Sequence, residues 1–160
     1  MEFESGEYQF RLEKLNAFEQ LHLSRKIAPL LPALAPVLVR WSTRSGDLLS
    51  TQILEIAELA EPFAVALADM KDVDAEQVLM TALSKVKVQT DVSRDVWMPV
   101  FAPGTHMTSI AELNDLGKLL PVAIKSIMFN LGNFMDALLT RREEKSATSS
   151  GAVSPVAKTG

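Results

Sequence analysis

The chain contains no cysteine, only two histidines and one tyrosine among its 160 residues. Without cysteine it can form no disulfide, no thiolate metal site and no cysteine nucleophile. His22 and His106 have neither cysteine partners nor an HExxH spacing, so they are a weak metal signal and are better explained as surface histidines. The sequence therefore predicts no metal and no cofactor.

Motifs of common catalytic sites are also missing. No G-x-S-x-G elbow and no phosphate-binding glycine loop is present. Asp72 and Asp74 resemble the start of a calcium loop, but Gln77 stands where that loop needs glycine and Leu83 where it needs glutamate. Acidic residues at this spacing suit the first turn of a helix, where they interact favourably with the positive end of the helix dipole. We expect a protein without enzymatic activity.

Charge and length exclude two further classes. The net charge of −4 offers no basic surface for nucleic acid. The apolar run at residues 27–39 contains three prolines and is shorter than the roughly 20 residues of a membrane span. Residues 119–139 are long enough, but Lys125 and Asp136 would be costly in lipid. At 48% hydrophobic, the chain instead predicts one globular domain with a real core and no membrane contact.

The most informative stretch is residues 119–139, which predict one helix that is apolar almost all the way round. An apolar stripe recurs at spacings of three and four residues. It consists of Leu120, Ile124, Ile127, Met128, Leu131, Met135 and Leu138. Such a helix must be covered, either by its own domain or by a partner, and both interpretations stay open. For the second, the predicted partner-binding residues are Leu120, Ile124, Ile127, Met128, Leu131, Phe134 and Met135.

Other periodic segments complete the predicted fold. Alternating residues predict strands at 7–12, 86–92 and 97–101, which suffice for a sheet of two or three strands. Asn16 and Glu19 form a capping box for a helix at 17–28, with Phe18, Leu21, Ile27 and Ala28 facing inward. A kinked apolar segment follows and ends near Trp41, and residues 45–47 indicate a turn.

Further helices are predicted at 49–60 and after Pro62, which suits a first helical position. Asp74 with Gln77, and Ser109 with Glu112, are capping pairs for two more helices. The fold class is therefore mainly α: a single helical domain of about five to six helices, residues 1–140, with a small two- or three-stranded sheet. Residues 141–160 are predicted to be a flexible tail because Ser, Thr, Ala and Gly dominate there. Core burial is the expected role of Trp41 and Trp97, with a contact at a protein interface as the alternative.

Two segments resemble a known family. Lys14-Leu-Asn-Ala-Phe-Glu-Gln-Leu-His-Leu-Ser-Arg-Lys-Ile-Ala-Pro29, preceded by Tyr8-Gln-Phe10, resembles the opening of phage tail assembly chaperones. Near the other end, Leu131-Gly-Asn-Phe134 resembles their closing motif, within the distinctive string Asn-Leu-Gly-Asn-Phe. Between them, residues 74–88 and then Trp97-Met-Pro-Val-Phe101 follow in the same order. The resemblance covers about residues 8–138, although Met107-Thr-Ser-Ile110 is less acidic than the family's approach to its last helix.

The resemblance implies a non-enzymatic role in the cytoplasm of the infected host. Such proteins are thought to keep the long tape-measure protein soluble and to help tail-tube subunits polymerise around it, and they are generally absent from the mature virion. The implied partners are the tape-measure protein and the tail-tube protein. The resemblance implies no list of contact residues, and self-association into a homo-oligomer stays open. The alternative is a small structural protein of the tail or its connector that is retained in the virion.

Overall fold

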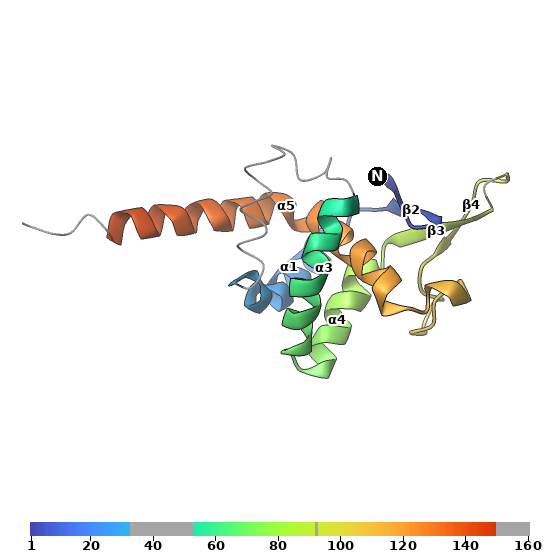
Figure 1. Cartoon of the computed structure of the whole chain (residues 1–160), viewed down its shortest axis with the longest axis horizontal. Helices are drawn as coiled ribbons and strands as arrows, with labels where there is room; N and C mark the ends of the chain where they lie inside the picture. Colours follow the sequence, from blue (N-terminus) through green and yellow to red (C-terminus); the bar gives the residue numbers. More distant parts are fainter. Residues whose placement is uncertain (33–52, 92, 150–160) are drawn as a thin grey trace, which may run out of the picture.

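The computed structural model describes the backbone of residues 1–32, 53–91 and 93–149, and their side chains except at 53–59, 133, 135–140 and 142–149. Figure 1 shows a β-sheet at one end of a helical body and one very long helix. In chain order the elements are strands β1 (Glu2–Ser5) and β2 (Tyr8–Leu12), helix α1 (Ala17–Ile27), a 3-10 turn (Ala28–Leu30), helices α3 (Ile53–Ala68) and α4 (Asp72–Leu83), strands β3 (Val86–Asp91) and β4 (Val96–Pro99), a second 3-10 turn (Ala111–Leu113) and helix α5 (Leu116–Ser149).

The sheet has four antiparallel strands in the order β1-β2-β3-β4. Strands β1 and β2 form a hairpin whose turn contains Gly6 at φ 61°, a left-handed conformation that glycine adopts at no steric cost. Because side chains alternate along a strand, Phe3, Phe10 and Val88 share the face that meets the helices. On the other face, the Arg11 guanidinium stacks over the Trp97 ring, 4.1 Å from its centroid.

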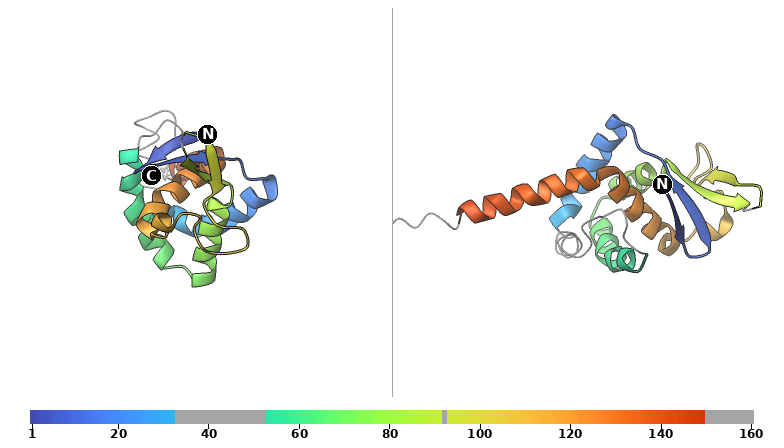
Figure 2. Two further views of the ribbon diagram at one scale, coloured as in Figure 1. Left: turned by 90° about the vertical axis from the view of Figure 1, so that its right-hand side faces the viewer. Right: turned by 90° about the horizontal axis from the view of Figure 1, so that it is seen from above.

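The core lies between the inner face of the sheet and the helices, with the first half of α5 at its centre. Helix α5 packs against α3, α4 and strands β1 and β2, and Figure 2 shows the sheet and the other helices gathered around this half. The largest fully buried side chains are Phe10, Phe63, Leu12, Leu23, Ile27, Leu83 and Leu113. These residues come from strands, helices and a 3-10 turn, so the described part of the chain shares one core.

The predicted counts of helices and strands are wrong. The described residues contain four α-helices and a four-stranded sheet, where the sequence predicts five to six helices and two or three strands. One cause is Pro62, which lies inside α3 and does not begin a new helix. The other is β1, whose four-residue Glu-Phe-Glu-Ser pattern is too short to predict a strand and is stabilised by pairing with β2. Strands β2, β3 and β4 lie close to the three predicted positions.

Helix beginnings agree with the sequence in one case of three. The Asn16–Glu19 capping box of α1 is present with both hydrogen bonds. Helix α4 instead begins at Asp72, so Asp74 lies inside it. The Ser109 hydroxyl donates to the Pro99 carbonyl, and α5 begins only at Leu116, where the Gly117 N–H donates to Asp115 Oδ1. At both positions the side chain expected to cap a helix makes a different contact: Asp74 pairs with Lys26 of α1, and Ser109 binds the Pro99 carbonyl.

Four predicted side-chain orientations are also wrong. Phe18 and Leu21 are 75% and 50% exposed and Ala28 is also exposed, whereas Ile27 is buried as predicted and α1 also buries Leu23. Trp97 lies partly exposed on the outer face of the sheet, where its indole N–H donates to Asp95.

The kinked segment and Trp41, the turn at 45–47 and the start of the helix at 49–60 lie outside the described residues. Helix α5 continues through 141–149, where the sequence predicts a flexible tail; residues 150–160 also lie outside the described part.

Candidate functional site

Helix α5 carries all of the predicted partner-binding residues, and the structure divides them into two groups. Five of the seven are buried in the core with exposures of 6% or less: Leu120, Ile124, Ile127, Met128 and Leu131. Phe134 is 48% exposed, and the side chain of Met135 lies outside the described set. The buried group therefore packs inside the domain, and Phe134 is the member of the predicted set whose described side chain another molecule could reach.

That later part forms an arm, which we define as residues 132–149 of α5. Figures 1 and 2 show it extending away from the other described elements. At about 1.5 Å per residue, the arm is roughly 27 Å long. A helix of this length is only marginally stable in water without tertiary contacts, because forming its first turn is costly and each further residue adds little stability. A covering partner would supply the missing contacts.

The arm leaves the body at a junction made by the two segments that carry the family resemblance. The backbone N–H of Leu15 donates to Asn130 Oδ1 at 2.8 Å. The Lys14 ammonium donates to the Phe129 carbonyl at 2.5 Å and lies 4.4 Å from the centroid of the Phe129 ring. One turn earlier in α5, the Ser126 hydroxyl donates to the Ala82 carbonyl of α4. These contacts fix the point and the direction in which the arm emerges.

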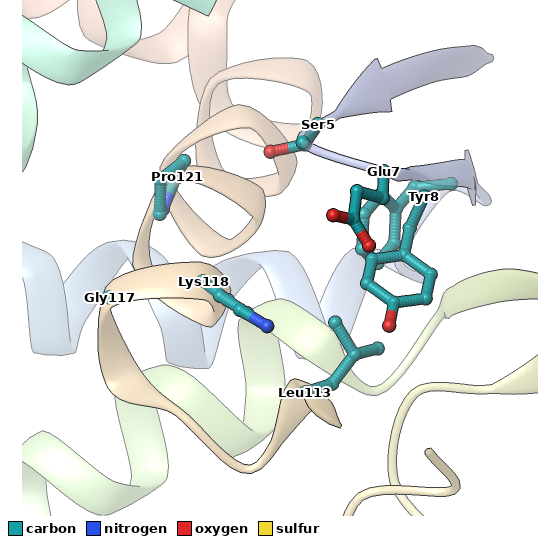
Figure 3. Close-up of a pocket in the computed structure, with 9 residues that line it drawn as sticks. Ser5, Glu7, Tyr8, Leu113, Gly117, Lys118 and Pro121 are labelled. Carbon is teal, nitrogen blue, oxygen red and sulfur yellow. The ribbon is translucent and has the colours of Figure 1, made fainter. Parts of the chain in front are cut away.

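A pocket of about 290 Å³ lies at the opposite end of α5. It is enclosed by the β1–β2 hairpin on one side and by the second 3-10 turn and the start of α5 on the other, as Figure 3 shows. Its lining residues are Ser5, Gly6, Glu7, Tyr8, Phe10, Leu113, Gly117, Lys118 and Pro121. Aromatic and aliphatic side chains form the floor, while small residues on both sides leave the space unfilled.

The mouth of this pocket carries charges of both signs. Glu7 projects from the hairpin turn and Lys118 projects from α5 toward the same space (Figure 3). Both residues are exposed, and neither side chain makes a hydrogen bond or an ion pair with any described residue. By contrast, Lys87 and Glu13, on the outer part of the body, are paired at 2.5 Å. The pocket thus combines an apolar floor with two charged groups at its mouth.

Lys125 is the one strongly buried cation of the described residues, with 7% exposure. Its ammonium group lies 5.8 Å from the centroid of the Phe3 ring. Burial lowers the pKa of Lys125 below its ordinary value of 10.5, because a buried site disfavours the charged form. The group sits in the core half of α5, so we assign it to the packing of the sheet on the helix.

The described side chains contain no group of three or more His, Cys, Asp or Glu residues arranged to hold a metal ion. His106 is instead 3.0 Å from Glu76 at the surface. In the same part of the chain, no helix combines the length and hydropathy that a membrane span requires.

Sequence reasoning identified α5 but missed the pocket. Its lining comes from segments more than 100 positions apart, and the pocket exists only because the hairpin meets the start of α5. The glycines at positions 6 and 117 line the pocket, but Gly6 is explained by its left-handed φ of 61° in the hairpin turn, so neither glycine predicts a cavity from sequence.

Comparison with known protein families matches residues 6–143 to the family described as phage tail assembly chaperone protein, TAC. The match spans the hairpin turn, the core and the first part of the arm. No curated protein and no solved structure matches the chain.

Proposed function

The chain belongs to the phage tail assembly chaperone family, and on this premise we propose that it binds the tape-measure protein and the tail-tube protein while the tail is being built. Membership indicates a role in the infected host cell and protein partners in tail assembly. We further propose that the protein works without enzymatic chemistry, in the host cytoplasm, and is absent from the mature virion.

The arm is the observation that carries this proposal. Its exposed Phe134 follows directly on a buried stripe, and the sequence of the arm continues the stripe with Met135 and Leu138. A helix with an apolar stripe recognises another protein by laying that stripe into a groove or along a second helix. A tape-measure chain is expected to present long apolar helical seams, so it is a suitable partner for the arm.

The division of α5 supports a holdase role over a purely structural one. Its core half is anchored by Asn130 and Ser126, while the arm extends away from the other described elements. A rigid base with an uncovered apolar extension can shield a client chain without the body having to unfold. Covering the client's apolar surface would keep it from aggregating before the tail-tube subunits enclose it.

The test is co-expression with the tape-measure protein encoded nearby, followed by measurement of soluble tape-measure protein and of the co-purified complex. Wild-type protein should keep its partner soluble. Phe134→Ser should reduce the recovered complex at least about tenfold, because losing a central aromatic contact costs about 2 kcal/mol or more. Phe18→Ser is the matched control: Phe18 is 75% exposed on α1, outside the arm.

Two results would contradict the proposal. One is a tape-measure protein that stays insoluble beside the wild-type chain, with no complex recovered. The other is the presence of this chain in purified virions by mass spectrometry, which would favour a structural protein of the tail or its connector.

A further inference from the structure

We propose that the pocket between the β1–β2 hairpin and the start of α5 is a second docking point, which receives one apolar side chain of a partner protein. The inference deepens the proposed function and rests on it, since it assigns a particular contact to the same kind of client. The arm and the pocket then lie at the two ends of one helix, Leu116–Ser149.

The volume suits a single side chain. A cavity of about 150 Å³ lined by apolar groups is enough to bind benzene. The pocket here has about 290 Å³, with Tyr8, Phe10 and Leu113 among its walls. It is therefore large enough for a leucine, methionine or phenylalanine side chain and for part of the main chain that carries it. Filling such a pocket is the usual role of an anchor residue at a protein interface.

The charges at the mouth specify the surroundings of that anchor. Lys118 and Glu7 reach toward the opening from opposite walls, and neither is paired with a described residue. A partner segment that carries an acidic residue on the Lys118 side and a basic residue on the Glu7 side would pair with both. Charge complementarity of this kind selects the partner and its direction of binding more than it adds affinity. A purely apolar small molecule would leave both charges without a partner.

Gly117 lines the pocket without a side chain. A Cβ added there would meet only Asp115 Oδ1, at 3.2 Å, so the Asp115 side chain, which accepts from the Gly117 N–H, must move by a few tenths of an ångström. A longer side chain at this lining position should reduce the free volume of the pocket. Helix propensity favours this change, because glycine is a poor helix residue.

The experiment compares Gly117→Met with Leu116→Met in co-expression with the tape-measure protein. Leu116 is the neighbouring residue, is 58% exposed and does not line the pocket. Gly117→Met should lower the recovered complex at least about tenfold relative to Leu116→Met, with melting temperatures of both variants close to that of the wild type. If Gly117→Met does not fold, Lys118→Glu carries the test, with Lys71→Glu as the matched charge reversal outside the pocket.

The outcomes separate the two proposals. A wild-type chain that recovers no tape-measure protein contradicts the proposed function, and this inference fails with it. If the wild-type chain recovers its partner and Gly117→Met or Lys118→Glu recovers it equally well, the pocket proposal alone is overturned. Sedimentation would measure the oligomeric state of each variant. If filling the pocket dissociates an oligomer of this chain and leaves client binding intact, a second copy of the chain occupies the pocket and the proposal is wrong.

Discussion

Asn130 in the last helix accepts a hydrogen bond from the backbone N–H of Leu15, a residue 115 positions earlier in the chain. Both partners are buried, with exposures of 7% and 2%. The Asn130 amide also donates to the Ser126 carbonyl at 2.9 Å, which holds its side chain in place within α5. The opening and closing segments of the family pattern are therefore in direct contact, at the base of the arm.

Replacing this asparagine should destabilise the fold. Asn130→Ala leaves the Leu15 N–H buried without an acceptor, which costs about 1–3 kcal/mol. Urea unfolding followed by circular dichroism would measure the change in the free energy of unfolding. Asn114→Ala, at an exposed position, is the control and should stay within about 0.5 kcal/mol of the wild type. Equal stabilities for the two variants would mean that the junction is not formed in solution.

The capping box of α1 predicts a second loss of stability. Asn16 Oδ1 accepts from the Glu19 N–H at 2.9 Å, and Glu19 Oε2 accepts from the Asn16 N–H at 2.8 Å. Asn16→Ala should lower the free energy of unfolding by about 1 kcal/mol. Asn16→Asp keeps an acceptor at the helix N-terminus and should recover most of the loss in the same denaturation experiment. If Asn16→Asp proves as unstable as Asn16→Ala, the capping role is contradicted.

The buried cation predicts an alkaline dependence of stability. The pKa of Lys125 is lower in the folded protein than its ordinary value of 10.5, so between these values the unfolded chain binds more protons. Wild-type stability should therefore rise as pH increases through this window. Lys125→Met has no such titration, so its stability relative to the wild type should be most favourable near neutral pH. The difference should move in favour of the wild type as the pH approaches 10.5.

Thermal melting between neutral pH and the ordinary lysine pKa of 10.5 would measure both effects. Lys118→Met, at an exposed position of the same helix, controls for the loss of one lysine charge and should stay within about 0.5 kcal/mol of the wild type near neutral pH. A constant difference between the wild type and Lys125→Met across the pH range would rule out burial as the cause.

An ion pair between α1 and α4 predicts an acid dependence. The Lys26 ammonium donates to the Asp74 carboxylate, and this bond holds the pKa of Asp74 below its ordinary value of 3.8. A depressed carboxyl pKa contributes stability above pH 3.8, and the contribution is lost as the pH falls through the folded value. Lys26→Met should therefore melt slightly below the wild type at neutral pH. The difference should close in strong acid and should shrink in about 1 M salt, because both groups are partly exposed.

The strength of local signals explains which predictions succeeded. The Asn16 capping box and the alternation of Val86 and Val88 involve neighbours in sequence, and both gave the predicted elements. Strand β1 has only four residues and becomes a strand by pairing with β2, so its alternation alone was a weak signal. The prediction at Pro62 failed because a proline that suits a helix start can also lie inside a helix whose packing compensates for the lost hydrogen bond.

The orientation of α1 shows that local sequence also does not decide which side chains of a helix are buried. The helical period places Phe18 and Leu23 on different faces, and either face could have been the buried one. The structure buries Leu23 and leaves Phe18 exposed because α1 packs on α4, a contact between segments about 50 residues apart.

By itself the sequence determined that this protein has no cysteine chemistry, one highly apolar late helix and a resemblance to a family of assembly chaperones. Those properties follow from residue types and from periods of two and 3.6, which short windows of sequence contain. Only the tertiary structure decided that Ile124 is core while Phe134 is exposed, and that Glu7 and Lys118 share the mouth of a pocket. The reason is that burial and pockets depend on which distant segments of the chain come into contact. The long-range packing that joins Leu15 to Asn130 cannot be predicted from any local sequence pattern.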